Sequence, residues 1–237
     1  MLIAIPSKGR AGKTKSDKFI TSAVLFVPET EVKAYETLAK NKVVGVPQNI
    51  VGITKTRNWI LDNTEDPHLV FIDDDLKVAG WVELLEFKGK HRKLTEHETI
   101  NEWEKLFEVT EDLKFTIWGV ATHSALQAIY PWKPFIFHTY VTASCMGIIN
   151  RGIRFDERFI VKEDYELCLR CIVKDGGIVG ARYIYWENSH WGNEGGCKDY
   201  RTQENELAAI KMLMKMYPGH IRKITKGGSS YSIELDF

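Results

Sequence analysis

Short apolar runs rich in β-branched residues recur along the chain, and most are followed by a longer polar stretch with helical periodicity. The runs that we predict to be strands are Leu2–Ile5, Ala23–Val27, Val43–Val46, His68–Ile72, Phe115–Ala121, Cys145–Ile149 and Ile178–Trp186. The predicted helices are Glu29–Leu38, Thr54–Leu61, Thr95–Val109, Glu163–Lys174 and Thr202–Met216. Alternation of this kind is typical of βα units around a mainly parallel sheet. The pattern therefore predicts an α/β fold.

Two of these helices have a predicted N-cap, and the chain has no obvious internal boundary. Thr54 is the predicted cap of the helix that runs to Leu61, and Thr95 begins a Thr-Glu-His-Glu capping box. With 237 residues, 44% of them apolar, the chain is long enough to bury a substantial core. No repeat, low-complexity segment or long linker divides it. We therefore predict a single domain over residues 1–237.

Charge and cysteine content exclude several classes of protein. The 32 Lys and Arg residues balance 32 Asp and Glu residues, which excludes a strongly basic, counterion-driven nucleic-acid binder. No stretch approaches the ~20 apolar residues of a membrane span, and the first apolar run is too short for a signal peptide. Four cysteines in this length do not indicate a disulfide framework. Cys168 and Cys171 fall inside a predicted amphipathic helix, so we expect them in the core and not on zinc. We expect a cytoplasmic protein with no membrane partner.

Asp73, Asp74 and Asp75 directly follow the apolar run His68–Ile72. In an open α/β sheet, loops at the carboxyl ends of strands line the ligand crevice. Three adjacent carboxylates repel one another, so we expect a positive charge among them. Mg²⁺ or Mn²⁺, shared between carboxylates and a diphosphate, is the natural candidate. A solvated acidic turn is the alternative.

A cation-containing loop follows the first predicted strand and consists of Pro6, Ser7, Lys8, Gly9 and Arg10. Its glycine lets the backbone approach a nucleotide, and its cations are suited to phosphates. The loop is not a Walker A motif, because Ser7 stands where that motif requires a glycine. Arg57 and Asn58, on a predicted helix, are expected to reach the same crevice, although an Arg on a surface helix is usually solvated.

These motifs resemble those of nucleotide-sugar glycosyltransferases of the GT-A fold, in which an Asp-x-Asp motif at a strand end holds the metal that bridges the donor diphosphate. The stretches that carry the resemblance are Ile5–Arg10, Lys55–Leu61, Val70–Asp75, Ser144–Gly147, Phe155–Phe159, Glu163–Leu167 and His190–Gly192. More narrowly, the chain resembles phage glycosyltransferases associated with TET-type dioxygenases, to which sugar transfer onto hydroxymethylated pyrimidines of phage DNA is attributed. The resemblance implies a GT-A-like (Rossmann-like), mainly parallel mixed sheet flanked by helices, and host cytoplasm as the location.

The resemblance also implies roles for individual residues. Asp75 and Asp73 are implied as metal ligands, with His190 as a third. Asp164, beside Glu163, is implied as the base that takes the proton of the acceptor hydroxyl in an inverting transfer. The implied donor site comprises Pro6, Ser7, Lys8, Gly9, Arg10, Arg57, Asn58, Asp73 and Asp74. Without the resemblance, Glu163 and Asp164 are ordinary first-turn acids that favour the helix dipole, and a lone histidine near tryptophans is usually packed or hydrogen-bonded.

The acceptor is predicted from two basic runs, Lys88–Lys93 and His220–Lys226. We predict that Lys90, Arg92, Lys93 and Trp191 contact it. The resemblance implies that the acceptor is a hydroxymethylated pyrimidine in DNA and that the donor is a nucleoside-diphosphate sugar, in the simplest case a uridine one. Most basic surface loops do not bind DNA, so two alternatives stay open. One is a saccharide or protein acceptor, and the other is a nucleotidyltransferase that releases pyrophosphate. The oligomeric state is not predicted.

Overall fold

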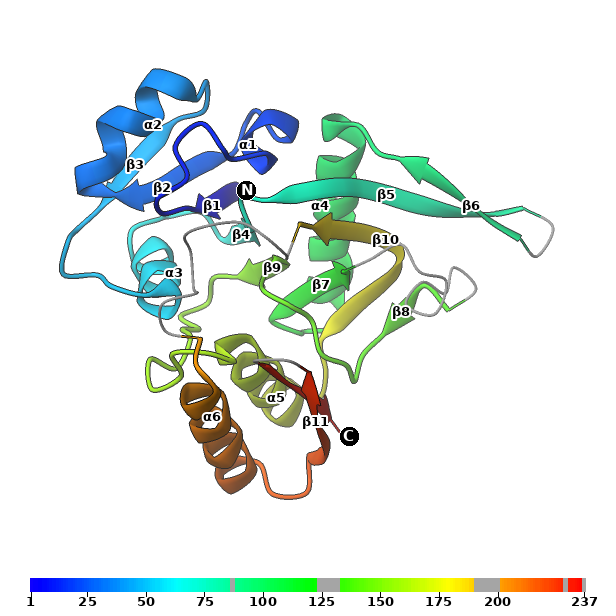
Figure 1. Cartoon of the computed structure of the whole chain (residues 1–237). Helices are drawn as coiled ribbons and strands as arrows, with labels where there is room; N and C mark the ends of the chain where they lie inside the picture. The colour runs from blue at the N-terminus through cyan, green and yellow to red at the C-terminus, as the bar shows by residue number, and fades with distance from the viewer. Residues whose placement is uncertain (86–87, 123–132, 190–200, 228–229, 236–237) are drawn as a thin grey trace.

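A mixed sheet forms the centre of the molecule in the computed structural model, which describes residues 1–85, 88–122, 133–189, 201–227 and 230–235 (Figure 1). Within these residues ten strands follow the order β3-β2-β1-β4-β9-β7-β10-β5-β6, with β8 paired to β10. The strands of this sheet are β1 (Leu2–Pro6), β2 (Val24–Pro28), β3 (Val43–Val46), β4 (His68–Ile72), β5 (Leu76–Leu85), β6 (Lys88–Lys93), β7 (Ile117–Ala121), β8 (Phe135–Ile136), β9 (Cys145–Ile149) and β10 (Val179–Asn188). The predicted α/β fold is confirmed.

The helices of the described residues are short to medium in length. They are α1 (Ser16–Phe19), the 3-10 turn η1 (Glu29–Glu31), α2 (Val32–Leu38), α3 (Ile53–Asp62), α4 (Glu96–Asp112), α5 (Glu163–Asp175) and α6 (Gln203–Met216). A separate hairpin, β11 (Ile221–Gly227) with β12 (Ser230–Leu235), follows α6. None of the helices within the described residues is both long and apolar enough to span a bilayer.

Strand direction brings several strand ends to one edge of the sheet. Strands β3, β2, β1 and β4 are parallel neighbours, and β9 runs antiparallel to both β4 and β7. Strand β10 is parallel to β7. The carboxyl ends of β1, β4, β7 and β10 therefore share an edge, where ligands bind in open α/β sheets.

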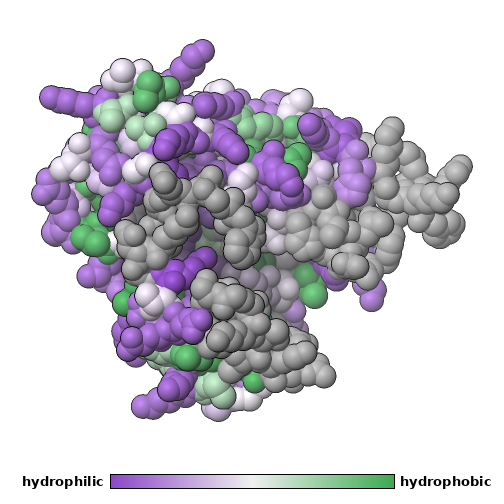
Figure 2. All heavy atoms as spheres, in the orientation of Figure 1, coloured by the Kyte–Doolittle hydropathy of each residue, from purple (hydrophilic) through white to green (hydrophobic). Residues whose placement is uncertain are grey.

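The two faces of the sheet are covered by different helices because strand side chains alternate. Ile3 and Ile5 of β1 belong to one buried cluster, which α2 and α4 complete, whereas Ala4 belongs to a second cluster with α3 and α5. Cys168 and Cys171 of α5 lie in that second cluster, as predicted from the sequence. On the face shown in Figure 2 the coloured surface is mostly hydrophilic, with scattered apolar residues.

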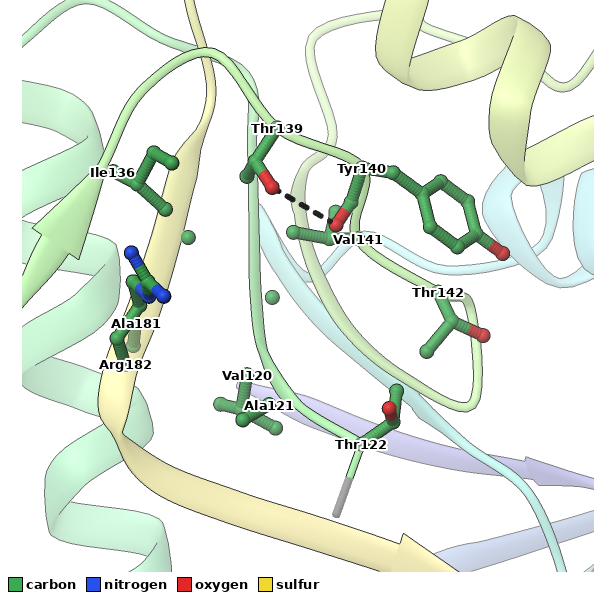
Figure 3. Close-up of a pocket in the computed structure, with 12 residues that line it drawn as sticks. Val120, Ala121, Thr122, Ile136, Thr139, Tyr140, Val141, Thr142, Ala181 and Arg182 are labelled. Atoms are coloured by element: carbon green, nitrogen blue, oxygen red, sulfur yellow. Dashed lines mark hydrogen bonds between the residues drawn. The ribbon is translucent and has the colours of Figure 1, made fainter. Parts of the chain in front are cut away.

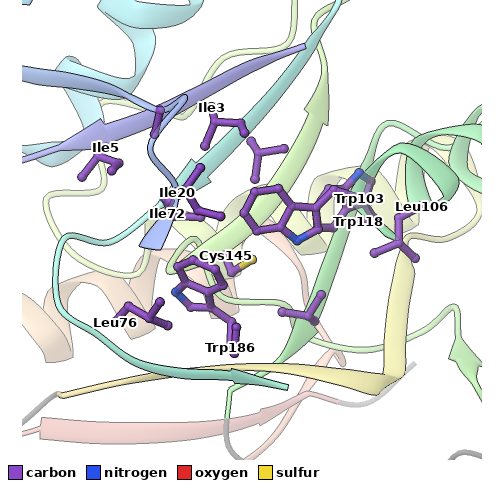
Figure 4. Close-up of a cluster of buried hydrophobic side chains, with 14 of the residues drawn as sticks. Ile3, Ile5, Ile20, Ile72, Leu76, Trp103, Leu106, Trp118, Cys145 and Trp186 are labelled. Carbon is purple, nitrogen blue, oxygen red and sulfur yellow. The ribbon is translucent and has the colours of Figure 1, made fainter. Parts of the chain in front are cut away.

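Three tryptophans anchor the first cluster (Figure 4). Trp103 of α4 has its ring centroid 6.3 Å from that of Trp118 and 5.5 Å from that of Trp186, and all three side chains are fully buried. Trp118 pairs in register with Gly147 of β9. A Cβ atom on Gly147 would lie 2.0 Å from Cε2 of Trp118, so the indole occupies the space that a side chain at that position would need.

The predicted helix starts are confirmed in one case and wrong in another. Thr95 caps α4 with a full capping box, and its backbone N–H, its hydroxyl and the Arg92 side chain lower the pKa of Glu98 to about 2. Thr54 does not cap α3. The helix begins one residue earlier, after Gly52, and the Thr54 hydroxyl donates to the carbonyl of Phe159 at 2.8 Å.

Both basic runs form strands where the sequence suggested surface loops. Lys88–Lys93 is β6, paired antiparallel with β5, and the second run lies in β11. The β5–β6 hairpin extends away from the body of the sheet (Figure 1). The second hairpin contributes Ile233 to a third buried cluster with α6 and the outer side of α5, including Leu169, Ile210 and Leu213.

We predict that Gly147→Ala lowers the free energy of unfolding by about 3 kcal/mol, because the rigid Trp118 indole must move to admit a methyl group. Urea denaturation of the purified protein measures this. Gly219→Ala is the control: its φ of +88° strains an alanine, but nothing lies within 4 Å of the new atom, so we expect a loss of about 1 kcal/mol. Equal losses in both variants would contradict the packing argument.

Candidate active site

Asp74 is the buried member of the acidic run, with 5% of its surface exposed. Its carboxylate accepts a hydrogen bond from the Ser7 hydroxyl and forms an ion pair with the Arg10 guanidinium. Ser7 Oγ lies 2.8 Å from the Tyr35 hydroxyl, to which the backbone N–H of Arg10 also donates at 3.0 Å. Burial raises the pKa of Asp74, and the Ser7 and Arg10 contacts oppose that rise. Asp74 thus joins the end of β4 to the loop after β1.

The backbone of the acidic turn is fixed by residues far away in sequence. The N–H of Lys15 donates to the Asp74 carbonyl at 2.8 Å, and the Ser16 hydroxyl donates to the Asp73 carbonyl. The N–H of Asp73 donates to the carbonyl of Ser144 at 3.0 Å. The start of α1 and the segment before β9 therefore hold the turn from two sides.

Strand β10 ends beside Asp75. The N–H of Ser189 donates to the Asp75 carbonyl at 2.9 Å, and the Lys15 ammonium donates to the Ser189 hydroxyl at 3.5 Å. The next two residues, His190 and Trp191, lie outside the described residues, so their predicted metal and acceptor roles stay predictions.

Arg57 connects the acidic turn to the start of α5. Its side chain is 4% exposed, and it lies 2.7 Å from Glu163 Oε1 and 3.6 Å from Asp73 Oδ1. The guanidinium carbon lies 5.9 Å from the centroid of the Phe71 ring and 5.5 Å from that of Phe155. A buried cation beside two aromatic rings thus bridges two carboxylates from different elements.

The electrostatics of this cluster favour an additional cation. The pKa of Asp73 is raised to about 7, chiefly by burial; Arg57 opposes this rise, and the charges of Asp75, Asp74 and Glu163 contribute to it. Burial is the largest cause that raises the pKa of Glu163. The charge of Asp164 raises it further, and Arg57 opposes this rise. The Asp73 side chain is still 38% exposed, so a cation can approach it from solvent.

The acidic turn offers the oxygen ligands that Mg²⁺ and Mn²⁺ prefer, and its side chains fit such an ion. Within the described ranges, no group of three or more His, Cys, Asp and Glu side chains is arranged to hold a metal. Asp73 and Asp75 would therefore supply only part of the coordination. Mg²⁺ commonly binds in this way, through one or two carboxylates plus phosphate oxygens and water.

Asp164 is held at the first turn of α5 by two hydrogen bonds. The hydroxyl of Tyr140 donates to its Oδ2 at 2.5 Å, and the N–H of Tyr165 donates to its Oδ1 at 3.0 Å. Burial and the Asp164 charge raise the pKa of Tyr140 well above its ordinary value, so this phenol stays protonated. The rings of Tyr140 and Tyr165 stack at 3.9 Å between centroids. The carboxylate therefore has a fixed orientation.

A pocket of about 290 Å³ is lined in part by residues 139–142, the segment that carries Tyr140 (Figure 3). Its lining includes Val120, Thr139, Thr142 and Arg182, with the glycines of β7 and β10. In Figure 3 Ala181 and Arg182 lie on the opposite side of the pocket from Tyr140, and the Tyr140 ring points away from them. The 139–142 segment thus separates the pocket from the Asp164 carboxylate.

The model of one protein family, TET-Associated Glycosyltransferase, matches residues 1–196. The chain belongs to this family. The predicted resemblance is therefore confirmed, and with it the expectation that the protein is a glycosyltransferase. No curated protein matches the chain significantly.

Two solved structures with TM-scores above 0.5 confirm the GT-A-like fold of this TET-associated glycosyltransferase. Glucosyl-3-phosphoglycerate synthase from Mycobacterium tuberculosis is similar at a TM-score of 0.54 and 10% identity, over 98% of this chain and 86% of that one. A mannosyltransferase from Pyrobaculum calidifontis has a TM-score of 0.55 at 10% identity, and the match covers 89% of this chain and 64% of the mannosyltransferase chain. TarS from S. aureus has a TM-score of 0.49 at 15% identity; the match covers 90% of this chain and 66% of the TarS chain.

The predicted donor residues of this TET-associated glycosyltransferase divide into exposed and buried sets. Lys8 and Gly9 are exposed after Pro6, the last residue of β1, and Gly9 has a φ of +69° that favours glycine. Ser7 and Asp74 are buried against each other. Asn58 is also buried: its amide donates to the Phe155 carbonyl at 2.9 Å and accepts from the Phe155 N–H at 2.8 Å. Protein groups already engage polar atoms of these three residues, and their direct contact with a donor stays a prediction.

The predicted acceptor residues are not brought together with the Arg57 cluster. Arg92 pairs with Glu98 at 2.6 Å and lies over the Trp81 ring at 5.8 Å, whereas Lys93 is exposed. Lys90 lies in β6, and its side chain is outside the described part of the structure. The hairpin that carries all three extends away from α3 and α5 (Figure 1).

No role in organising the site was predicted from the sequence for Ser16, Tyr35, Tyr140 and Ser144, although Ser144 begins one of the stretches that carry the resemblance. Tyr35 lies inside a helix, and Tyr140 stands in an aromatic-rich stretch without periodicity, so neither belongs to a recognisable local motif. Ser144 contributes only a backbone carbonyl, which leaves no signal in residue type. The 28 positions between Ser7 and Tyr35 show why only the folded chain reveals such a contact.

We predict that Arg57→Met lowers the free energy of unfolding by about 3–5 kcal/mol, since it leaves Glu163 as an uncompensated buried charge and removes the cation beside the partly exposed Asp73. Guanidinium denaturation measures the loss. The double variant Arg57→Met/Glu163→Gln should regain part of it, because one of the two carboxylates is then neutral. A single-variant loss below about 1 kcal/mol would show that the bridge does not hold these elements together.

Proposed function

We propose that this protein transfers a sugar from a nucleoside-diphosphate donor to a hydroxymethylated pyrimidine in DNA, with a divalent cation at the acidic turn. The observation that carries the proposal is the Arg57 bridge, which gathers Asp73 and Glu163 around one buried guanidinium. Family membership supports the same reaction class. The proposal assigns the turn to the donor and the start of α5 to the acceptor.

For the donor, we assign the cation to Asp73 and Asp75, with His190 proposed as a further ligand. When bound, the cation neutralises the charge of the leaving diphosphate. The exposed Lys8 and Gly9 face the phosphates in this proposal, and the Asp74–Arg10 ion pair holds their loop in place. The Mycobacterium tuberculosis structure contains UDP, and the Pyrobaculum calidifontis structure contains GDP-Man and Mn²⁺, which supports testing uridine donors first and Mn²⁺ as the cation.

For the transfer, we assign Asp164 as the general base. Its carboxylate takes the proton from the acceptor hydroxyl as that oxygen bonds to the anomeric carbon, and the bond from this carbon to the diphosphate breaks. The nucleoside diphosphate leaves with the electron pair, and the sugar is transferred with inversion. The Tyr140 hydroxyl and the Tyr165 N–H orient the carboxylate for this step.

For the acceptor, the family name links the chain to TET-type oxygenases, whose products carry hydroxymethyl groups. Lys93, exposed on β6, and Lys90 are proposed to contact the DNA backbone, whereas Arg92 is engaged with Glu98. An acceptor contacting this hairpin would have to extend from β6 to the start of α5. A DNA duplex is large enough to do so, which favours it over a small saccharide.

The experiment that tests this function is incubation with radiolabelled nucleotide sugars, with and without Mn²⁺, against plain and hydroxymethylated DNA. We expect label on hydroxymethylated DNA only, with Mn²⁺ present, and release of nucleoside diphosphate. Label on a saccharide or protein acceptor in place of DNA would overturn the acceptor. Release of pyrophosphate from a nucleoside triphosphate would overturn the reaction class.

Asp75→Ala is predicted to remove a metal ligand and with it both donor binding and transfer. Calorimetric titration of UDP in the presence of Mn²⁺ should show binding to the parent protein and none to the variant. Asp112→Ala, which removes an exposed carboxylate from the end of α4, is the control and should bind as the parent does. Metal-dependent transfer retained by Asp75→Ala would refute the assigned role.

Asp164→Asn is predicted to leave donor affinity within twofold and to reduce turnover by ~10² or more, because the amide cannot accept the acceptor proton. Steady-state kinetics separate KM for the donor from kcat. A thermal melt tests for a purely structural effect. If the melting temperature falls sharply while the remaining folded protein turns over normally, Asp164 is a structural residue of the helix start.

A further inference from the structure

A buried ion pair lies directly beside the acidic start of α5. Lys162 Nζ is 2.8 Å from Glu206 Oε2 of α6, and the two side chains are 8% and 3% exposed. Arg201 is the second cation that faces Glu206, with its Nε 3.7 Å from Oε1. Burial of a charged pair is costly, and removing one partner leaves the other charge uncompensated. The pair therefore fixes α5 relative to α6.

The backbone of Lys162 is unusual for the residue type. It occupies the N-cap position of α5 with a φ of 62° and a ψ of 25°, the left-handed region that favours glycine. Its side chain provides no cap hydrogen bond. A glycine at this position would satisfy the backbone better, so the contribution of Lys162 to the structure lies in where its ammonium goes.

Contacts run from this ammonium to the proposed base. Lys162 Nζ lies 5.0 Å from the centroid of the Tyr165 ring, a distance suited to a cation–π interaction. The Tyr165 ring stacks on Tyr140 with an interplanar angle of 12°. The Tyr140 hydroxyl in turn donates to Asp164. Each group in this series limits the freedom of the next.

We propose that Lys162 and Glu206 are positioning residues, which orient the Asp164 carboxylate through Tyr165 and Tyr140; this rests on the assignment of Asp164 as the base. Glu206 lies beyond residues 1–196, the part that matches the family. The helix α6 thus supplies a group that the family match does not contain. The pair acts on turnover and not on donor affinity, since the donor is assigned to the acidic turn.

The experiment compares Lys162→Met, Glu206→Gln and the double variant. Each single variant is expected to lower the melting temperature and to reduce kcat at least tenfold, with KM for the donor within twofold. The double variant should recover most of the melting temperature, because its buried charges are gone together. Its kcat should stay at least tenfold low, because the ammonium that orders Tyr165 is absent. Recovery of kcat along with stability would overturn the proposal and leave the pair purely structural.

Two further variants make the outcome specific. Lys162→Arg keeps the cation and should retain more kcat than Lys162→Met. Arg151→Met removes the arginine of an exposed pair with Glu111 of α4 and should leave both kcat and melting temperature unchanged.

A triple variant separates this proposal from the assignment of Asp164. Adding Lys162→Met/Glu206→Gln to Asp164→Asn should cost little further turnover if the pair acts through that carboxylate. If Asp164→Asn alone turns over normally, the assignment of the base has failed. A full tenfold additional loss in the triple variant would instead overturn the positioning route while leaving the base assignment in place.

Discussion

The buried guanidinium of Arg57 is the contact on which the site depends. It comes from α3, and it offsets carboxylates at the end of β4 and at the start of α5. Burial is the largest cause that raises the pKa of Asp73 and Glu163, and neighbouring carboxylates raise both further, so without the Arg57 cation these acids would take up protons or turn to solvent. Arg57 is therefore what allows two acidic segments to meet inside the protein at neutral pH.

The carboxylates of the acidic run contact different partners. Asp74 turns inward to Ser7 and Arg10, and Asp73 approaches Arg57 while remaining partly open to solvent. The positive charge expected among these carboxylates is thus supplied in part by the protein's own arginines. Repulsion within the run is consequently a weaker argument for a metal than it is from sequence alone. The stronger argument is the need to neutralise a donor diphosphate beside an acidic turn that already has a surplus of negative charge.

The elements predicted best from sequence are those whose periodicity reflects burial. The bounds of Val43–Val46, His68–Ile72 and Cys145–Ile149 were predicted to the residue, because each is an apolar run in the sheet. Strand β6 was missed because an edge strand rich in Lys and Arg has no apolar alternation. Side-chain partners were harder still: Arg57 and Glu163 are 106 positions apart, and nothing local in the chain indicates that one will neutralise the other. The sequence therefore allowed strands to be predicted from their burial pattern, whereas the partner of a buried charge such as Arg57 could not be predicted.

Helix α5 is packed on two sides, and this explains how its first turn can hold the proposed base in a fixed position. Leu167, Cys168 and Cys171 face the sheet in the second cluster, while Leu169 faces α6 in the third. A helix buried on one side alone can rock about its axis, and a carboxylate at its end would move with it. Burial on both sides removes that motion, because interiors are close-packed and resist displacement. The third cluster and the Lys162–Glu206 pair thus act on the same element, one through packing and the other through charge, and α6 contributes to both.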